Sequence, residues 1–207
     1  MQRPSHPISL PPYYTIEQML NMVDEPNRSA CFRVLADNRK LFQMERGSTN
    51  NHQAWPGGYF DHVQEIMNHT VYEYRVYQPI RPYPFPLGDP LVVSFFHDIE
   101  KPWKYELGAD GQWHHTRHFE TKAQAHAFRD KKMKEYGVVL TPEQENGMKY
   151  VEGEFEDYTN RHRVMGPLAA LCHIADVRSA RIDYDHPLAE NDPWPGARRI
   201  RDCDGNV

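Results

Sequence analysis

The sequence predicts a mainly α-helical fold with one small β-hairpin. Apolar residues recur at helical spacing in several segments, and capping signals mark where these segments begin or end. A single Asp-Gly turn separates two aromatic-rich runs, which favours a hairpin there. A length of 207 residues and a hydrophobic content of 39% fit one domain with one sizeable core.

The N-terminal half is expected to alternate helices with irregular segments. In order, we expect a Pro-rich extended arm over residues 1–14, a helix over 15–24, a helix starting at Pro26, a loop over 46–57 and a helix over 58–77. The stretch 78–90 contains five prolines, so we expect a stiff connection rather than a helix interior. The apolar segment 91–98 fits either a strand or a buried helix by its length.

The C-terminal half begins with the expected hairpin over residues 102–119, turning at Ala109-Asp110-Gly111. Thr121 is suited to cap a helix that reaches Tyr136, with Gly137 at its C-terminal end. Further helices are expected from Thr141 to about residue 155 and over 166–182, followed by a Pro-rich and charged tail.

Composition excludes several classes of protein. The net charge of -5 gives no strong signal for nucleic-acid binding. No segment approaches the roughly 20 apolar residues that span a bilayer, and the N-terminus lacks the apolar run of a secretory signal. We therefore expect a cytoplasmic protein without a membrane partner. The sequence does not indicate an oligomeric state.

Three short motifs are separated along the chain and carry the residues suited to metal chemistry. They are His52-x-x-x-x-Gly57-Gly58-x-x-x-His62, then His97-Asp98-Ile99-Glu100-Lys101 after the apolar run 91–96, and finally His173-x-x-Asp176. A divalent metal needs ligands that converge from different parts of a fold, and imidazole with carboxylate suits transition metals better than calcium. Two adjacent glycines allow a sharp turn and a close backbone approach.

In this order, the motifs resemble those of the HD-domain metal-dependent phosphohydrolase superfamily. The resemblance covers roughly residues 50–180 and implies an HD-domain helical bundle, with 91–98 helical and the hairpin as an insertion. It places the domain core at about 50–182, with the arm 1–14 and the tail 183–207 outside it.

The resemblance also implies roles for individual residues. It implies His62, His97, Asp98 and Asp176 as metal ligands, with His173 supporting Asp176 from one helical turn away. Asp98 would also orient the attacking water, Lys101 would bind phosphate, and Glu100 is a candidate to activate water. Glu100 replaces a glycine of the family motif, which leaves the local backbone geometry open.

The sequence also bears on how many metal ions bind. His126 and Glu152 are candidates for a second metal or for substrate binding, but the paired histidines typical of two-metal relatives are missing. The sequence favours one divalent ion and does not distinguish Mn, Fe, Co, Ni, Zn or Mg.

The expected function is hydrolysis of a phosphate ester or anhydride of a small nucleotide. Two alternatives stay open, namely an HD-type di-iron oxygenase and a catalytically silent nucleotide-binding module. Neither the base nor the number of phosphates follows from the sequence.

Overall fold

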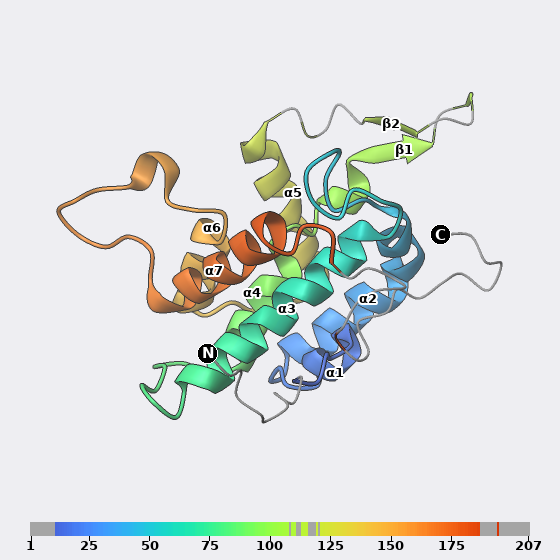
Figure 1. Cartoon of the computed structure of the whole chain (residues 1–207). Coiled ribbons are helices and arrows are strands. Elements are labelled where there is room, and N and C mark those ends of the chain that lie inside the picture. Colours follow the sequence, from blue (N-terminus) through green and yellow to red (C-terminus); the bar gives the residue numbers. More distant parts are fainter. Residues whose placement is uncertain are drawn as a thin grey trace, which may run out of the picture.

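A computed structural model describes residues 11–107, 109–110, 113–115, 119, 121–186 and 194 (Figure 1). Its α-helices are α1 (Ile16–Leu20), α2 (Asn27–Met44), α3 (Gly58–Tyr77), α4 (Gly88–Phe96), α5 (Lys122–Glu135), α6 (Pro142–Tyr150) and α7 (Pro167–Arg181). Short 3-10 helices cover Lys101–Trp103 and Phe155–Asp157. The predicted mainly helical fold is confirmed.

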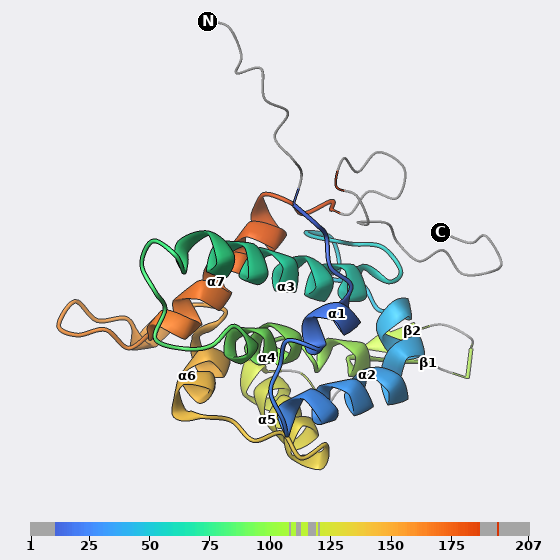
Figure 2. The ribbon, with the colours of Figure 1, turned by 90° about the horizontal axis from the view of Figure 1, so that it is seen from below.

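Helix α3 lies at the centre of the bundle and contacts α1, α2, α4 and α7. Every residue of α3 from Gly58 to Val71 is buried. Figure 2 shows α4 alongside α3, with α2 and α6 on either side of α4. Helix α7 packs along α3, so two segments far apart in the sequence form one seam. That seam carries the site described below.

Threonine caps begin three of the helices, two of which were predicted from the sequence. Thr15, Thr121 and Thr141 each accept a hydrogen bond from the backbone N–H three residues later, and the glutamine there binds back to the threonine N–H. This reciprocal arrangement satisfies two donors that the first turn of a helix leaves free.

Three predicted boundaries are wrong. Helix α1 ends at Leu20 and not at the predicted residue 24. Helix α4 begins inside the Pro-rich stretch, because Pro90 falls in its first turn, where a missing N–H costs no helical hydrogen bond. Helix α6 ends at Tyr150, earlier than predicted, because Gly153 adopts a φ of 122° that a helix does not allow.

The predicted hairpin insertion is not seen as a complete unit. Segments β1 (Tyr105–Leu107) and β2 (Trp113–His115) pair antiparallel, with Glu106 opposite His114. Residues 108, 111 and 112 of the connection lie outside the described part of the chain, as do most of the predicted arm and tail. No helix among the described residues is long and apolar enough to cross a membrane.

Candidate metal centre

Two glycines position the first histidine. Gly57 precedes α3 with a φ of 81°, a left-handed conformation that strains other residues. A Cβ on Gly58 would lie 1.8 Å from the carbonyl oxygen of Gln53, so only glycine fits there. The predicted sharp turn and close approach are confirmed, and they place His62 one turn into α3 with no exposed surface.

His97 and Asp98 follow the last residue of α4, whose apolar side chains anchor them in the core. Beyond them the chain winds more tightly, with the N–H of Lys101 donating to the carbonyl of Asp98 at 3.0 Å. Side chains three residues apart align in such a turn, which brings Lys101 against Asp98. Glu100 has ordinary right-handed helical angles, so replacing the glycine of the motif creates no strain.

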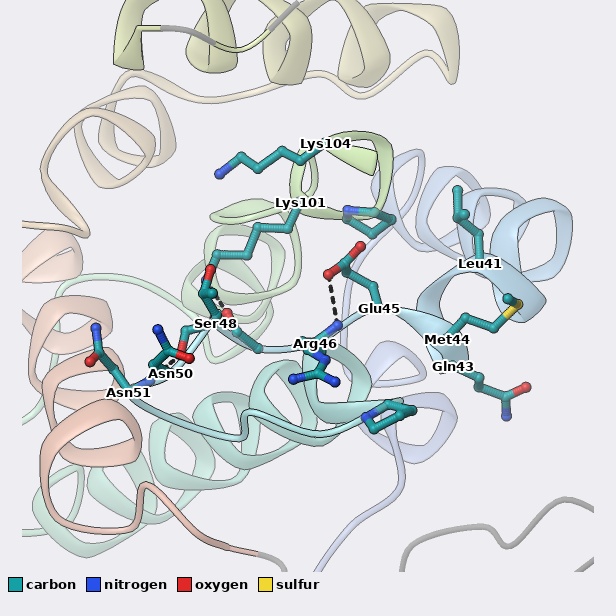
Figure 3. A pocket seen from close by; sticks show the side chains of 14 residues that line it. Leu41, Gln43, Met44, Glu45, Arg46, Ser48, Asn50, Asn51, Lys101 and Lys104 are labelled. Atoms are coloured by element: carbon teal, nitrogen blue, oxygen red, sulfur yellow. Dashed lines mark hydrogen bonds between the residues drawn. The ribbon is translucent and has the colours of Figure 1, made fainter. Parts of the chain in front are cut away.

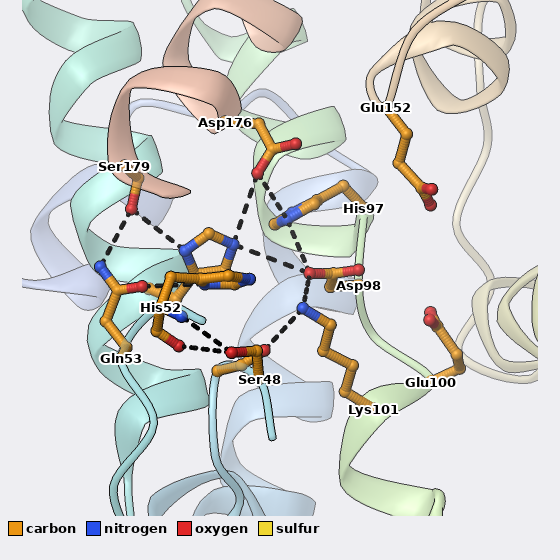
Figure 4. A network of polar contacts seen from close by, with 12 residues as sticks. Ser48, His52, Gln53, His97, Asp98, Glu100, Lys101, Glu152, Asp176 and Ser179 are labelled. Atoms are coloured by element: carbon orange, nitrogen blue, oxygen red, sulfur yellow. Dashed lines mark hydrogen bonds and ion pairs between the residues drawn. The ribbon is translucent and has the colours of Figure 1, made fainter. Parts of the chain in front are cut away.

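The predicted metal ligands converge from α3, α4 and α7 (Figure 4). His62 Nε2 lies 3.5 Å from Asp176 Oδ1 and 3.7 Å from Asp98 Oδ2. His97 Nε2 lies 3.1 Å from the same Asp98 oxygen and 3.9 Å from the same Asp176 oxygen. One ligand atom each of His62, His97 and Asp176 lies within 4.8 Å of the others, a spacing that one metal ion can bridge.

The other ring nitrogens fix how the histidines face this centre. His97 Nδ1 lies 2.8 Å from the carbonyl oxygen of Ser94, to which it can only donate. His62 Nδ1 lies 3.0 Å from the Ser179 hydroxyl. Both Nε2 atoms are buried and have no hydrogen-bond partner among the described residues. Imidazoles held at Nδ1 in this way direct Nε2 toward the centre, as metal-bound histidines do.

Burial and the two carboxylates shift the histidine pKa values in opposite directions. Burial lowers the pKa of His62 to about 4. Burial also disfavours the charged form of His97, but the charges of Asp98 and Asp176 outweigh it and raise the pKa to about 9. Asp98 and Asp176 therefore favour a positive charge beside them, as their effect on His97 shows.

Lys101 and Glu100 border the centre on the Asp98 side. The Lys101 ammonium pairs with Asp98 and donates a hydrogen bond to the carbonyl of Gly47 at 2.7 Å. Glu100 is buried and pairs with Lys104 at 3.2 Å, while its second oxygen has no hydrogen-bond partner among the described residues. Burial and the charge of Asp98 raise the pKa of Glu100.

The predicted accessory residues lie farther out. His126 Nε2 is 3.6 Å from a Glu152 oxygen, and Lys122 pairs with Glu152 at 2.7 Å. In Figure 4 the carboxylates of Glu152 and Glu100 point toward one another beside Asp98. The His126–Glu152 pair is in neither group of potential metal ligands that the described residues form. His173 directs Nδ1 to the Val151 carbonyl at 2.7 Å, toward α6 instead of Asp176.

Two residues with a positioning role were missed from the sequence. Ser179 lies three residues after Asp176 and therefore on the same face of α7, a spacing that could have indicated it. Gln53 donates to the Ser179 hydroxyl at 3.2 Å and is fully buried with a φ of 38°. No local pattern marks Gln53, because its role depends on how the loop packs.

A cavity of about 760 Å³ opens beside Lys101 (Figure 3). Its volume falls in the range of small-molecule binding pockets. It is lined by Leu41, Gln43, Met44, Glu45, Arg46, Gly47, Ser48, Thr49, Asn50, Asn51, Pro56, Lys101, Pro102 and Lys104. Three cations, several amide and hydroxyl groups and a short apolar wall thus lie together next to the metal centre.

No protein family model, curated protein or solved structure matches the chain. The helical bundle and its His/Asp group are compatible with an HD domain. What the centre does is therefore argued from its own chemistry.

Proposed function

We propose that this chain is an HD-type metal-dependent phosphohydrolase that cleaves a phosphate ester or anhydride of a nucleotide. The observation that carries the proposal is the meeting of two buried Nε2 atoms, both without hydrogen-bond partners, with an Asp176 oxygen. Buried polar atoms normally have partners, so their convergence calls for a cation. The nitrogen and oxygen donors fit Mn, Fe, Co, Ni or Zn.

When bound, a divalent ion polarises a phosphoryl oxygen and lowers the pKa of a coordinated water. His62, His97 and Asp176 would hold the ion, with Asp98 as the fourth donor. The Ser94 carbonyl accepts the Nδ1 proton of His97, and the Ser179 hydroxyl holds Nδ1 of His62, so both Nε2 atoms face the proposed ion.

The side chains at the mouth of the centre suit a phosphate substrate. Lys101 lines the cavity and contacts Asp98, so it can bind a phosphate beside the ligand set. Arg46 and Lys104 line the same cavity and add positive charge. The unpartnered Glu100 oxygen can accept a proton from a water molecule near phosphorus.

The cavity supports a small nucleotide over a polymer. Its volume accommodates a compound of nucleotide size, and its apolar wall at Leu41 and Met44 can contact a base. The amides of Asn50 and Asn51 offer hydrogen bonds to a base or sugar.

The test is a phosphate-release screen of nucleotides with Mn²⁺ or Co²⁺, with products identified by mass spectrometry. We expect turnover by the wild type and its loss, together with loss of bound metal, in Asp98→Ala. Asp37→Ala, which removes an exposed aspartate of α2, is the matched control and should keep full activity. Unchanged phosphate release by metal-free Asp98→Ala would refute the proposal.

Two other results would favour the alternatives. Nucleotide binding without turnover under any of Mn²⁺, Co²⁺, Ni²⁺, Mg²⁺ and Fe²⁺ would favour a silent binding module. Two irons per chain with oxygen uptake would favour a di-iron oxygenase.

A further inference from the structure

The His–Asp pair of the metal centre recurs once along the seam between α3 and α7. His62 faces Asp176, and seven residues later on each segment His69 faces Asp183. Seven residues are close to two helical turns, so the second pair lies on the same side of α3, about 10 Å farther along its axis. Asp183 lies just beyond α7. Its backbone N–H donates a hydrogen bond to the Arg178 carbonyl at 3.0 Å, which holds it there.

A third ligand joins the repeated pair. Glu65 precedes His69 by one helical turn, a spacing that places both side chains on one face. His69 Nε2 lies 2.7 Å from Glu65 Oε1 and 3.1 Å from Asp183 Oδ2. One ligand atom of each residue lies within 4.8 Å of the others, as in the metal centre. We call Glu65, His69 and Asp183 the outer cluster.

Two members of the outer cluster are buried, and its ligand atoms meet as ion-pair contacts and not as hydrogen bonds. Glu65 is fully buried and His69 is 7% exposed. Although they lie close together, His69 Nε2, Glu65 Oε1 and Asp183 Oδ2 form no hydrogen bond of acceptable geometry with any described residue. Three ligand atoms that converge on one point suit either a shared proton or a cation between them.

The other Glu65 oxygen is already occupied, which leaves Oε1 available. Tyr13 donates a hydrogen bond to Oε2 at 2.9 Å, and His186 Nε2 lies 3.0 Å from the same atom. These contacts fix the orientation of the Glu65 carboxylate, as hydrogen bonds to a metal-bound carboxylate do.

One contact competes with a metal. The Arg178 side chain is half-exposed, and its Nε lies 3.1 Å from Asp183 Oδ2. Its exposure lets it shift to the second carboxylate oxygen of Asp183 while Oδ2 binds an ion. The alternative occupant of the cluster is a proton on His69, which would make His69 a charged bridge between two carboxylates.

We propose that the outer cluster is a second metal site, which takes a divalent transition ion of the Zn²⁺ class through Glu65, His69 and Asp183. One imidazole and two carboxylates match the donor preferences of such ions. The site joins α3 to the segment that follows α7. Gln53 also holds that segment, because its side chain donates to the carbonyls of Asp183 and His186.

The proposed site has a structural connection to the metal centre. Gln53 donates to the Ser179 hydroxyl as well as to the segment after α7, and Ser179 contacts His62. Metal in the outer cluster would therefore stabilise the residues that orient His62, without contacting substrate. It does not form a bimetallic pair with the centre, because about 10 Å exceeds the 3.5–4 Å spacing of such pairs.

The test counts Zn²⁺ bound by the full chain after EDTA treatment, incubation with Zn²⁺ alone and gel filtration. Four proteins are compared by elemental analysis: the wild type, His97→Gln, His69→Gln and the double variant. We expect two ions, one, one and none. Tyr13→Phe removes the hydrogen bond to Glu65 but no ligand atom, so it is the matched control and should keep both ions.

A second readout uses unfolding temperature. Zn²⁺ should raise the unfolding temperature of His97→Gln, which keeps only the outer cluster, but not that of the double variant. Asp183→Asn, at a partly exposed position, replaces His69→Gln if the latter does not fold.

The outcomes separate this proposal from the proposed function. If the metal centre binds nothing, His97→Gln retains the wild-type count while His69→Gln still loses one ion. If His69→Gln and Asp183→Asn both retain the wild-type count, the second site is refuted and His69 is the protonated bridge.

Discussion

The metal centre and the outer cluster lie on the same seam, yet they hold their histidines differently. In the centre, neutral groups bind Nδ1 of His62 and His97, so each Nε2 faces the carboxylates. In the outer cluster, His69 Nε2 itself lies 2.7 and 3.1 Å from two carboxylate oxygens. Carboxylate oxygens lie 3.1 to 3.9 Å from the Nε2 atoms of the centre, which leaves more room for an ion there, whereas the shorter contacts of His69 also suit a proton.

Access also separates the two regions. The centre borders a cavity through Lys101, so a substrate can reach it. The outer cluster is covered by Tyr13, whose ring packs against Trp194 with centroids 5.0 Å apart. We therefore expect the metal centre to act on a substrate and the outer cluster to stabilise the fold.

The largest expected effect comes from Asp176→Asn, which removes the only charge that α7 contributes to the ligand set among the described residues. We expect phosphate release to fall roughly a thousandfold, since metal-assisted catalysis contributes several kcal/mol to lowering the barrier. Steady-state phosphate release checks this, alongside a Zn²⁺ count in which the ion of the outer cluster persists. Asp183→Asn is the paired control, with activity within a few-fold of wild type. Equal losses in the two variants would contradict the division of roles.

The second-largest effect tests the loop that supports both the metal centre and the outer cluster. Gly58→Ala places a Cβ 1.8 Å from the Gln53 carbonyl and should displace the loop that supports both regions. We expect a loss of about 3 kcal/mol in unfolding free energy, typical of severe overpacking. Urea denaturation of metal-free protein measures it.

Gly137→Ala is the control for that substitution. Gly137 also has a positive φ, of 76°, but a Cβ there would meet only Arg33 Nη2 at 3.9 Å. We expect about 1 kcal/mol from backbone strain alone. A Gly58→Ala loss no larger than this would show that the loop yields freely and does not link the regions.

The sequence predicted the centre better than the outer cluster, for a physical reason. His62, His97 and Asp176 sit on or directly after well-marked helices, so their spacing and order carry the information. Asp183 follows the last helix and was assigned to an irregular tail, which hid its match with His69. Tyr13 and Gln53 reach the seam from irregular segments, whose positions depend on the packed fold.

Predicted helix boundaries are wrong where a single proline or glycine decides where the helix begins or ends. The five prolines of 78–90 predicted a connection, but Pro90 is compatible with the first turn of α4. The apolar spacing after Thr141 suggested a helix to residue 155, but Gly153 leaves the helical conformation first. The mainly helical class was recoverable because it rests on many segments at once.

Ser179→Ala tests the orientation of His62. Without the hydroxyl, Nδ1 loses its partner, and we expect metal affinity of the centre to fall about 10- to 100-fold. Ser94→Ala is matched in chemistry but should leave that affinity unchanged, since His97 uses the Ser94 backbone carbonyl. Competition with a fluorescent Zn²⁺ chelator measures both variants in the His69→Gln background, so that only the centre contributes. The same affinity loss in the two variants would show that general destabilisation, and not the Nδ1 contact, is responsible.

The smallest expected effect concerns the cavity. Lys104 lines it and pairs with Glu100, so Lys104→Met removes one of the three cations beside the centre. A partly exposed charge contributes up to about 1 kcal/mol, so the KM for a nucleotide should rise roughly threefold at low salt and less at high salt. Lys40→Met, an exposed position on α2 outside the cavity, should leave KM unchanged. Because the outer cluster does not border the cavity, its Zn²⁺ affinity should be the same in both variants. A change in that affinity would mean that the two regions are coupled through charge as well as through Gln53.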